Sequence, residues 1–448
     1  MLKSKLFPVI LALCAAVLCV GGAKKEFPTV RVTEVAGFRF TAATDRADSR
    51  VEIGDKITLS VRADAAEKQR CRVELFVNGN SYGLPMAIYK GQVAEYVVTP
   101  DAPGVVGIIC TALDADGAIL RGPRNRRVAG GIGVLVSPDK IRPGNPDEPA
   151  DFDEFWKARR AELDKVPVRA ERTEVPLAPE YAKVVCYDVK VDCVGGAPVS
   201  GYLCMPRGAK PKSLPALVKY HGAGVRSAVK RPAYAINAIS FDVNAHGIEN
   251  GKPGSFYKAL NNGRLKGYSH LGFANDKTVY FIGMFQRVMR ALDYVKSLPE
   301  WDGKTLIVQG QSQGGGQSLA AAALDPQVTL CCANVPALCD LGGRSLGRRP
   351  GWPIASLPHK IQTDAAVRAR TAYVDGVFFA RRIKCPVYMS TGLVDHTCVS
   401  SAVFSAFNSI PAGVEKHMYI NPSGNHDTSD SIEGDTVIRK ILGAEPRR

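Results

Sequence analysis

The spacing of apolar residues changes about one third of the way along the chain. From residue 27 to about 137, short runs of alternating apolar and polar residues are separated by turn-forming residues such as Asn78-Gly79. These runs lie at 56–64, 71–79, 94–100 and 104–117. Several short strands at regular spacing, without a helical period, are typical of a β-sandwich. We therefore predict an immunoglobulin-like sandwich over residues 27–137.

Strands and helices alternate in the rest of the chain. A Pro- and Asp-rich stretch, 138–150, is predicted to be a linker, and an amphipathic helix is predicted to open the next domain, 151–448. Buried strands are expected at 215–222, 236–243, 304–310, 328–335, 385–392 and 415–421, with helices at 279–298 and from about residue 313. This alternation predicts an α/β domain with a mostly parallel sheet and helices on both faces.

The N-terminus has the pattern of a secretory signal peptide. Lys3 and Lys5 precede an apolar run at 6–20, and small residues follow up to Ala23. The run is shorter than the roughly 20 residues of a membrane-spanning helix. We predict cleavage after Ala23 and a secreted or periplasmic protein that is free of the membrane once cleaved. An uncleaved anchor is the alternative.

One glycine-rich segment carries the clearest chemical signal. Gly310-Gln311-Ser312-Gln313-Gly314 lies between a predicted strand and a predicted helix. In that context a G-x-S-x-G sequence is typical of a nucleophile elbow, a sharp turn that exposes the serine hydroxyl above a sheet. Ser312 is therefore the predicted nucleophile; a plain glycine-rich turn is the alternative.

A serine nucleophile needs a base and an acid that orients the base. In α/β-hydrolases these follow the serine in the order Asp or Glu, then His, each in a loop after a strand. Asp395 follows the strand expected at 385–392, and His426 follows the strand expected at 415–421. We predict a triad of Ser312, Asp395 and His426.

Other candidates fit the order less well. Asp340, after an earlier strand, is the second choice for the acid. His396 shares a loop with Asp395, and His417 lies within a strand. His270 and His359 lie in segments interpreted as insertions, where exposure is the usual state.

Two backbone N–H groups are expected to stabilise the oxyanion that forms during ester cleavage. One belongs to Gln313, the residue after the nucleophile. The other is expected in His221-Gly222-Ala223-Gly224, the turn after the first parallel strand, where Ala223 is the candidate. We interpret His221 as a structural residue of this turn.

At these residues the chain resembles the acetyl xylan esterase and cephalosporin C deacetylase group, carbohydrate esterase family 7. The resemblance covers about two thirds of the chain. The matching stretches are DFDEFWKARRAEL, YHGAG, RALDYVKSLPEWDGKTLIVQGQSQGGGQSLAAAAL, YVDGVFFARRIKCPVYMSTGLVDHTC and SAVFSAFN. The resemblance implies an α/β-hydrolase fold, the triad and oxyanion residues given above, an acylated carbohydrate substrate and a homo-oligomer.

The chain departs from the family pattern near the site. Ala223 replaces a tyrosine that bounds the acyl pocket, which opens the question of bulkier acyl groups. Asn244-Ala245-His246 replaces Arg-Gly-Gln, so His246 is a further candidate for contacting substrate, with a structural role as the alternative. Asp427 replaces the glutamate that commonly follows the catalytic histidine.

The net charge and the cysteines say less about function than the motifs do. The formal net charge is +15, which suits an anionic polysaccharide or cell surface but also describes an ordinary basic surface. No nucleic-acid motif is present, and the cysteine spacing supports no zinc site. Cys71 and Cys110 can pair if their strands are neighbours. Neither metal nor organic cofactor is expected.

The sequence thus predicts a secreted serine esterase that removes acetyl or other small acyl groups from carbohydrate, such as xylan-type oligosaccharides, through an acyl-enzyme. Two alternatives remain open at this point. One is another α/β-hydrolase activity, as a glucuronoyl-type esterase or a peptidase, because the pocket rather than the fold sets the substrate. The other is a non-catalytic glycan-binding protein.

Overall fold

The computed structural model describes residues 15–19, 27–64, 70–145, 148–274, 278–427 and 430–445. Most of the predicted signal peptide, 1–23, lies outside these residues; Ala15–Cys19 within it forms strand β1. Within the described ranges no helix combines the length and apolar character needed to cross a membrane.

The chain divides into two compact units. The sandwich unit comprises Met1–Ile141, Gly392–Phe404 and Ile420–Thr428. The sheet unit comprises Arg142–Thr391, Ser405–Tyr419 and Ser429–Arg448. Two segments from late in the sequence thus belong to the same unit as the N-terminal strands.

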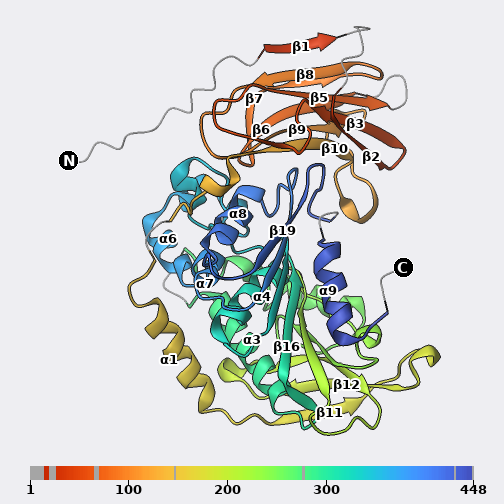
Figure 1. Cartoon of the computed structure of the whole chain (residues 1–448), viewed down its shortest axis with the longest axis vertical. Coiled ribbons are helices and arrows are strands. Elements are labelled where there is room, and N and C mark those ends of the chain that lie inside the picture. Colours follow the sequence, from red (N-terminus) through yellow and green to blue (C-terminus); the bar gives the residue numbers. More distant parts are fainter. Residues whose placement is uncertain are drawn as a thin grey trace. The chain divides into compact units, whose positions relative to one another are not determined.

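In the described residues, the N-terminal strands form two five-stranded sheets (Figure 1), with the orders β1-β8-β5-β3-β2 and β4-β10-β9-β6-β7. Neighbours pair antiparallel except β4 and β10, which pair parallel. The strands are β1 Ala15–Cys19, β2 Thr29–Val35, β3 Phe38–Thr44, β4 Arg50–Val51, β5 Ile57–Asp64, β6 Cys71–Val77, β7 Asn80–Ile88, β8 Val93–Val98, β9 Gly104–Ala112 and β10 Ala129–Val136. The predicted sandwich is confirmed.

The two sheets share one apolar core. Alternate residues of β8 point into it, and residues such as Leu59 and Ile108, from different sheets, are fully buried there. Burial of such side chains contributes about 1.5–3 kcal/mol each to stability. Cys71 and Cys110 lie on the neighbouring strands β6 and β9, but both are free thiols, so the pairing that the sequence allowed is absent.

The sheet unit is built on a sheet of nine strands, as far as the chain is described, in the order β11-β12-β13-β15-β14-β16-β17-β18-β19. Strands β11 to β13 pair antiparallel, β13 pairs antiparallel with β15, and the pairs from β15 to β18 are parallel. The strands are β11 Ala170–Glu174, β12 Val184–Val191, β13 Val199–Pro206, β14 Leu214–Tyr220, β15 Ile239–Asn244, β16 Trp301–Gln311, β17 Leu330–Asn334, β18 Val387–Gly392 and β19 Lys416–Asn421. This is the predicted α/β-hydrolase architecture.

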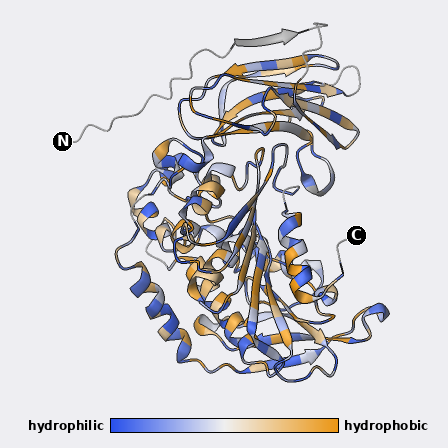
Figure 2. Ribbon diagram, in the orientation of Figure 1, coloured by the Kyte–Doolittle hydropathy of each residue, from blue (hydrophilic) through white to orange (hydrophobic). Residues whose placement is uncertain are grey.

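Helices pack against this sheet and against each other. They are α1 Phe152–Asp164, α2 Gly254–Asn262, α3 Tyr280–Lys296, α4 Gln313–Leu324, α5 His359–Gln362, α6 Ala365–Ala372, α7 Gly376–Ala380, α8 Ser400–Ser409 and α9 Ile432–Leu442. The central helices α3 and α4 are largely buried, whereas α1 buries one stripe of residues against α3 and α7. Figure 2 shows the apolar residues gathered along the sheet strands, and α1 largely hydrophilic.

Candidate active site

The backbone at Ser312 makes a strained turn between β16 and α4. Ser312 has φ 57° and ψ −123°, values that a non-glycine residue rarely adopts. Its N–H donates to the carbonyl of Asn334 at 2.9 Å, and its carbonyl accepts from the N–H groups of Gly316 and Ala337 at 3.1 and 2.9 Å. These bonds hold the serine in the geometry of a nucleophile elbow.

Two glycines of the motif are required by close packing. A Cβ on Gly314 would lie 2.0 Å from the carbonyl oxygen of Tyr220 at the end of β14. A Cβ on Gly310 would lie 2.2 Å from the carbonyl oxygen of Gly314. Because neither neighbour is a flexible side chain, the turn is possible only with bare backbone at both positions.

The predicted oxyanion turn follows β14 and is held by His221. The Nε2 of His221 accepts a hydrogen bond from the N–H of Ala245 at 3.1 Å. Burial, with Arg226 nearby, lowers the pKa of His221 to about 4, so the ring is neutral at physiological pH. This histidine thus ties the turn to the loop after β15. Ala223 itself is exposed, and Gln313 is buried.

Tyr268 connects the oxyanion turn to the elbow. Its hydroxyl accepts from the N–H of Gly224 at 3.1 Å and donates to Oε1 of Gln313 at 2.7 Å. Sequence reasoning missed this residue because its role depends on contacts with Gly224 and Gln313, both about 45 residues away along the chain. No motif or period marked it.

His246 is enclosed by the same network. Its Nδ1 lies 2.9 Å from the hydroxyl of Tyr280, its Nε2 lies 3.3 Å from the carbonyl of Gly224, and its ring meets the Tyr268 ring edge-on at 4.4 Å. Burial lowers the pKa of His246 to about 3, which keeps the ring neutral. Both ring nitrogens therefore face protein groups, and one of these is the Gly224 carbonyl in the oxyanion turn.

Asp395 and His426 form a directly bonded pair in the sandwich unit. Oδ2 of Asp395 accepts from Nδ1–H of His426 at 2.8 Å. Oδ1 accepts from the N–H groups of Thr397 and Cys398 at 2.7 and 3.0 Å. The carboxylate is fully buried, while the imidazole keeps 24% of its side-chain surface exposed. In this arrangement Nδ1 carries the proton that is shared with Asp395.

The pair raises the pKa of His426. Burial alone would lower it, but the hydrogen bonds to Asp395 and Cys398 and the charge of Asp395 favour the protonated ring and outweigh burial. The pKa therefore lies above the ordinary value for histidine, which makes the imidazole a stronger base than an unpaired one.

The competing candidates are engaged elsewhere. Asp340, the second choice for the acid, pairs with Arg348 at 2.7 Å and accepts from the N–H of Gly144 at 2.6 Å. His396 meets the ring of Phe76 edge-on at 5.2 Å. His417 stacks on Tyr388 at 4.5 Å. His417 also pairs with a carboxylate, Oε1 of Glu415 at 2.9 Å, but both side chains are exposed, whereas the carboxylate of Asp395 is fully buried.

Each unit thus holds part of the predicted machinery. Ser312, Ala223 and Gln313 belong to the sheet unit, and Asp395 and His426 belong to the sandwich unit. The structure shows the elbow and the acid–base pair separately. That they act together as a triad stays a prediction at this point.

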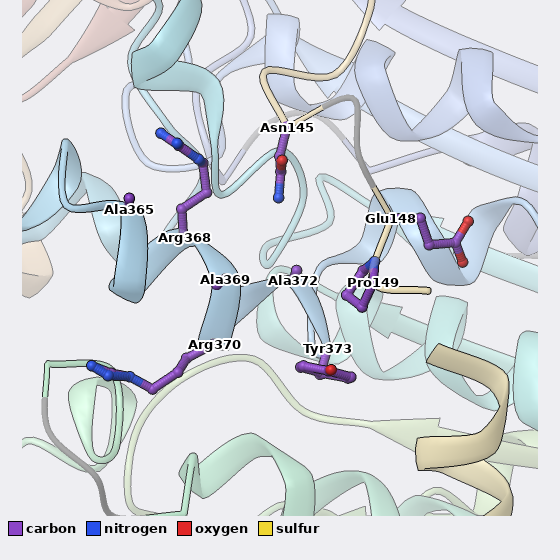
Figure 3. Close-up of a pocket in the computed structure, with 9 residues that line it drawn as sticks. All are labelled: Asn145, Glu148, Pro149, Ala365, Arg368, Ala369, Arg370, Ala372 and Tyr373. Carbon is purple, nitrogen blue, oxygen red and sulfur yellow. The ribbon is translucent and has the colours of Figure 1, made fainter. Parts of the chain in front are cut away.

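Two pockets in the sheet unit bear on the search for a site. A polar cavity of about 570 Å³ is lined by the ends of β14 and β16, including Lys219 and Gln309. A second, of about 440 Å³, is lined by α6 and residues near Glu148, with Arg368 and Arg370 extending in different directions (Figure 3). No predicted catalytic residue lines the second one. Within the described ranges, no cluster of His, Cys, Asp or Glu is arranged to hold a metal ion.

Comparison with known proteins gives consistent results for the larger part of the chain. A family model described as acetyl xylan esterase (AXE1) matches residues 139–441. Acetyl esterase Axe7A of Xylanibacter ruminicola is 35% identical over 305 residues, which are 66% of this chain and 68% of that protein.

Solved structures agree. An acetyl xylan esterase from Paenibacillus sp. R4 has 26% identity and a TM-score of 0.55, over 68% of this chain and 98% of that one. Acetyl xylan esterase 1 from Thermoanaerobacterium sp. JW/SL YS485 has 25% identity and a TM-score of 0.55, over 68% of this chain and 97% of that one.

The close packing of the elbow predicts the effect of adding one methyl group. Gly314→Ala forces Cβ against the Tyr220 carbonyl and should lower the free energy of unfolding by about 1–3 kcal/mol, the usual cost of overpacking. Gly413→Ala, where a Cβ meets no atom within 4 Å, is the control. Urea unfolding of both variants measures the difference. Equal stabilities would contradict the packing argument.

The bridge made by Tyr268 predicts a reactivity change. Tyr268→Phe leaves the Gly224 N–H and Oε1 of Gln313 without this partner, which loosens the oxyanion turn. We expect fluorophosphonate to label Ser312 about tenfold more slowly, since a lost buried hydrogen bond costs about 1–3 kcal/mol. Tyr257→Phe is the control, because the hydroxyl that it removes bonds to neither the oxyanion turn nor Gln313. Equal labelling rates for the two variants would rule out the bridging role.

Proposed function

Because this chain belongs to the acetyl xylan esterase family, we propose that it removes acetyl or other small acyl groups from carbohydrate through an acyl-enzyme at Ser312. Membership makes the protein a serine carboxylic-ester hydrolase. The observation that carries the residue assignment is the strained backbone of Ser312, between β16 and α4 and inside the matched region. A serine is held in this conformation where its hydroxyl must be presented for attack.

In the proposed first step, Nε2 of His426 takes the proton from the Ser312 hydroxyl as its oxygen attacks the ester carbonyl. The bond between Nδ1 and Asp395 supports this step, because it fixes the tautomer in which Nδ1 carries the proton and Nε2 is the accepting nitrogen. Asp395 also stabilises the imidazolium that forms, since its carboxylate faces Nδ1–H.

The attack turns the carbonyl oxygen into an oxyanion. In the proposal it is met by the backbone N–H groups of Ala223 and Gln313, each worth about 2.7–4 kcal/mol when such a donor is well placed. The bonds of Tyr268 to Gly224 and to the Gln313 side chain support this assignment, because they fix the turn and the elbow at the flanking positions.

The intermediate then collapses. The imidazolium of His426 gives its proton to the departing sugar oxygen, the carbon–oxygen bond of the ester breaks, and the acyl group stays on Ser312. A water molecule, deprotonated by the same imidazole, attacks the acyl-enzyme; the bond between the acyl carbon and the Ser312 oxygen then breaks, the imidazolium returns the proton to that oxygen, and the carboxylic acid is released. Every proton is accounted for by His426, so these steps need no further group.

The substrate class follows from the relatives and from one substitution. The relatives reported above act, by their names, on acetyl esters and on acetyl xylan. Ala223 presents a methyl group where the family has a tyrosine, and it is exposed. We therefore include acyl groups somewhat larger than acetyl in the proposal. We further propose export outside the cytoplasm, from the pattern of residues 1–23, and assembly into a homo-oligomer, from the family.

The first test is acetate release from acetylated xylo-oligosaccharides. The mature chain should release acetate, and Ser312→Ala should lose nearly all activity, since loss of the serine nucleophile costs about 10⁶-fold in kcat in a serine protease with the same kind of triad. Ser409→Ala, which removes a hydroxyl that donates to the Ser405 carbonyl within α8, is the matched control. Full activity in Ser312→Ala would refute the assignment. Release of no acetate, with Ser312 still labelled by fluorophosphonate, would point to another ester or to a peptide bond.

The raised pKa of His426 predicts the pH dependence. The base must be neutral, so kcat/KM should rise with pH through the pKa of His426, with its inflection above that of an unpaired histidine. Asp395→Asn removes the charge that raises this pKa, so the inflection should move to lower pH while kcat falls about 10⁴-fold. Asp364→Asn, at a helix N-cap that Asn serves equally well, should change neither. An unchanged inflection in Asp395→Asn would contradict the pairing.

A further inference from the structure

The outer face of the sheet that contains β9 and β10 is buried. All residues of β9 and all but the first of β10 are buried, although alternate residues point away from the sandwich core. Val105 and Leu135, on the outer side, are 3% and 0% exposed. An open sandwich face normally carries polar residues that water solvates. Two late segments of the same unit, 392–404 and 420–428, contribute contacts to this face.

The backbone of β10 touches two loops there. The N–H of Gly133 donates to the carbonyl of Pro422 at 2.9 Å. A Cβ on Gly133 would lie 2.6 Å from the Cβ of Leu393. Leu393 is two residues before Asp395, and Pro422 is four before His426. Glycine is thus required at 133 because the loops that carry the acid and the base approach this strand so closely.

Phe76 of β6 makes a second contact on this face. Its ring is 3% exposed and lies outside the shared sandwich core. A Cβ on Gly107 would lie 2.4 Å from its ring, so the side chain lies over β9 on the outer side. The ring meets His396 edge-on at 5.2 Å, and His396 directly follows Asp395.

An ion pair makes the third contact. Arg126, in the segment between β9 and β10, bonds through Nη2 to Oδ1 of Asp427 at 2.8 Å. Asp427 directly follows His426. The residue after the acid and the residue after the base are therefore each contacted by a side chain of the sandwich.

The two loops are also bonded to each other. The N–H of Leu393 donates to the carbonyl of Asn421 at 3.0 Å, and the N–H of Val394 donates to that of Gly424 at 3.1 Å. The next link along the loops is the hydrogen bond between Asp395 and His426. Strand β10 and the two loops thus form a closed frame around the acid–base pair.

We propose that Phe76, Arg126 and Gly133 are positioning residues for the esterase reaction, through which the β-sandwich holds Asp395 and His426 in bonding geometry. The proposal rests on the function proposed above, in which this pair activates Ser312. All three residues precede residue 139, where the family match begins, so the match does not assign them a role.

Loss of these positioning contacts should slow the chemical step and so lower kcat. Displacement of catalytic groups by about 1 Å can cost about a hundredfold in rate even when the mutation is remote. A longer bond to Asp395 would also weaken the interaction that raises the pKa of His426. Loss of positioning therefore predicts a lower kcat together with a pH inflection shifted toward lower pH. A loss of folded protein would lower only the number of active sites.

The main experiment compares two Gly→Ala variants of the full mature chain. Gly133→Ala pushes a methyl group against Leu393; in Gly122→Ala the new methyl group has ordinary contacts, the nearest at 3.4 Å. Hydrolysis of p-nitrophenyl acetate gives kcat, KM and the pH profile, with active sites counted by fluorophosphonate titration. In Gly133→Ala we expect kcat per active site to fall about tenfold to a hundredfold, KM to change little and the inflection to move to lower pH. Gly122→Ala should behave as wild type.

A surface variant covers the case in which Gly133→Ala fails to fold. Arg126→Ala removes a partly exposed ion pair and should lower kcat about two- to fivefold, with the same direction of pH shift. Arg126→Lys should restore most of the loss, and about 1 M salt should lower wild-type kcat toward that of Arg126→Ala by screening the pair. Arg121→Ala, whose guanidinium bonds to the Asn125 carbonyl, is the control.

A proton resonance gives a readout that does not depend on turnover. The Nδ1 proton of an imidazole bonded to a carboxylate gives a far-downfield NMR signal. It should be present in wild type and in Gly122→Ala, and lost or moved upfield in Gly133→Ala. The positioning role is overturned if this signal, the inflection and kcat per active site are alike in Gly133→Ala and Gly122→Ala. Wild type that neither hydrolyses esters nor is labelled at Ser312 would instead overturn the proposed function, while the resonance still tests the frame.

Discussion

The backbone of Ser312 is the constraint on which the rest of the sheet unit depends. Its positive φ is unfavourable for a residue with a Cβ, by about 1–3 kcal/mol, and persists only because surrounding structure over-determines it. The hydrogen bonds to Asn334 and Ala337 provide this, and they exist because β17 lies beside β16 in the parallel sheet. The strain at one residue is thus supported by the pairing of whole strands.

Three buried histidines differ in the direction of their pKa shift because they have different partners. His221 and His246 face backbone groups, a hydroxyl and nearby arginines, so burial dominates and both stay neutral in structural positions. His426 is also buried for the most part, but it is hydrogen-bonded to Asp395 and Cys398, and these two partners together raise its pKa. The imidazole group therefore has a structural position in His221 and His246, and it is the proposed base in His426.

Local patterns predicted most of the fold, because strand and helix periods and the G-x-S-x-G sequence are local properties. The loops of Asp395 and His426 were also predictable, since the order along an α/β-hydrolase sheet places them. Tyr268 was not, because its role depends on a contact with Gln313, 45 residues later, that no local pattern encodes. The role of Gly133 was hidden for the same reason: only the approach of Leu393 shows why the strand lacks a side chain there.

The contacts on the outer face of the sheet account for the unbroken apolar runs of β9 and β10. A sandwich that only linked or carried the hydrolase domain would gain nothing from apolar residues on its outer face, which would be exposed to water at a cost of about 25 cal/mol per Å². Leu135 on that face is fully buried, and Gly133 beside it is bonded to Pro422. The residues that bury the outer face include loops whose geometry the proposed chemistry requires. Stability of the sandwich and alignment of the acid–base pair therefore depend on the same packed surface.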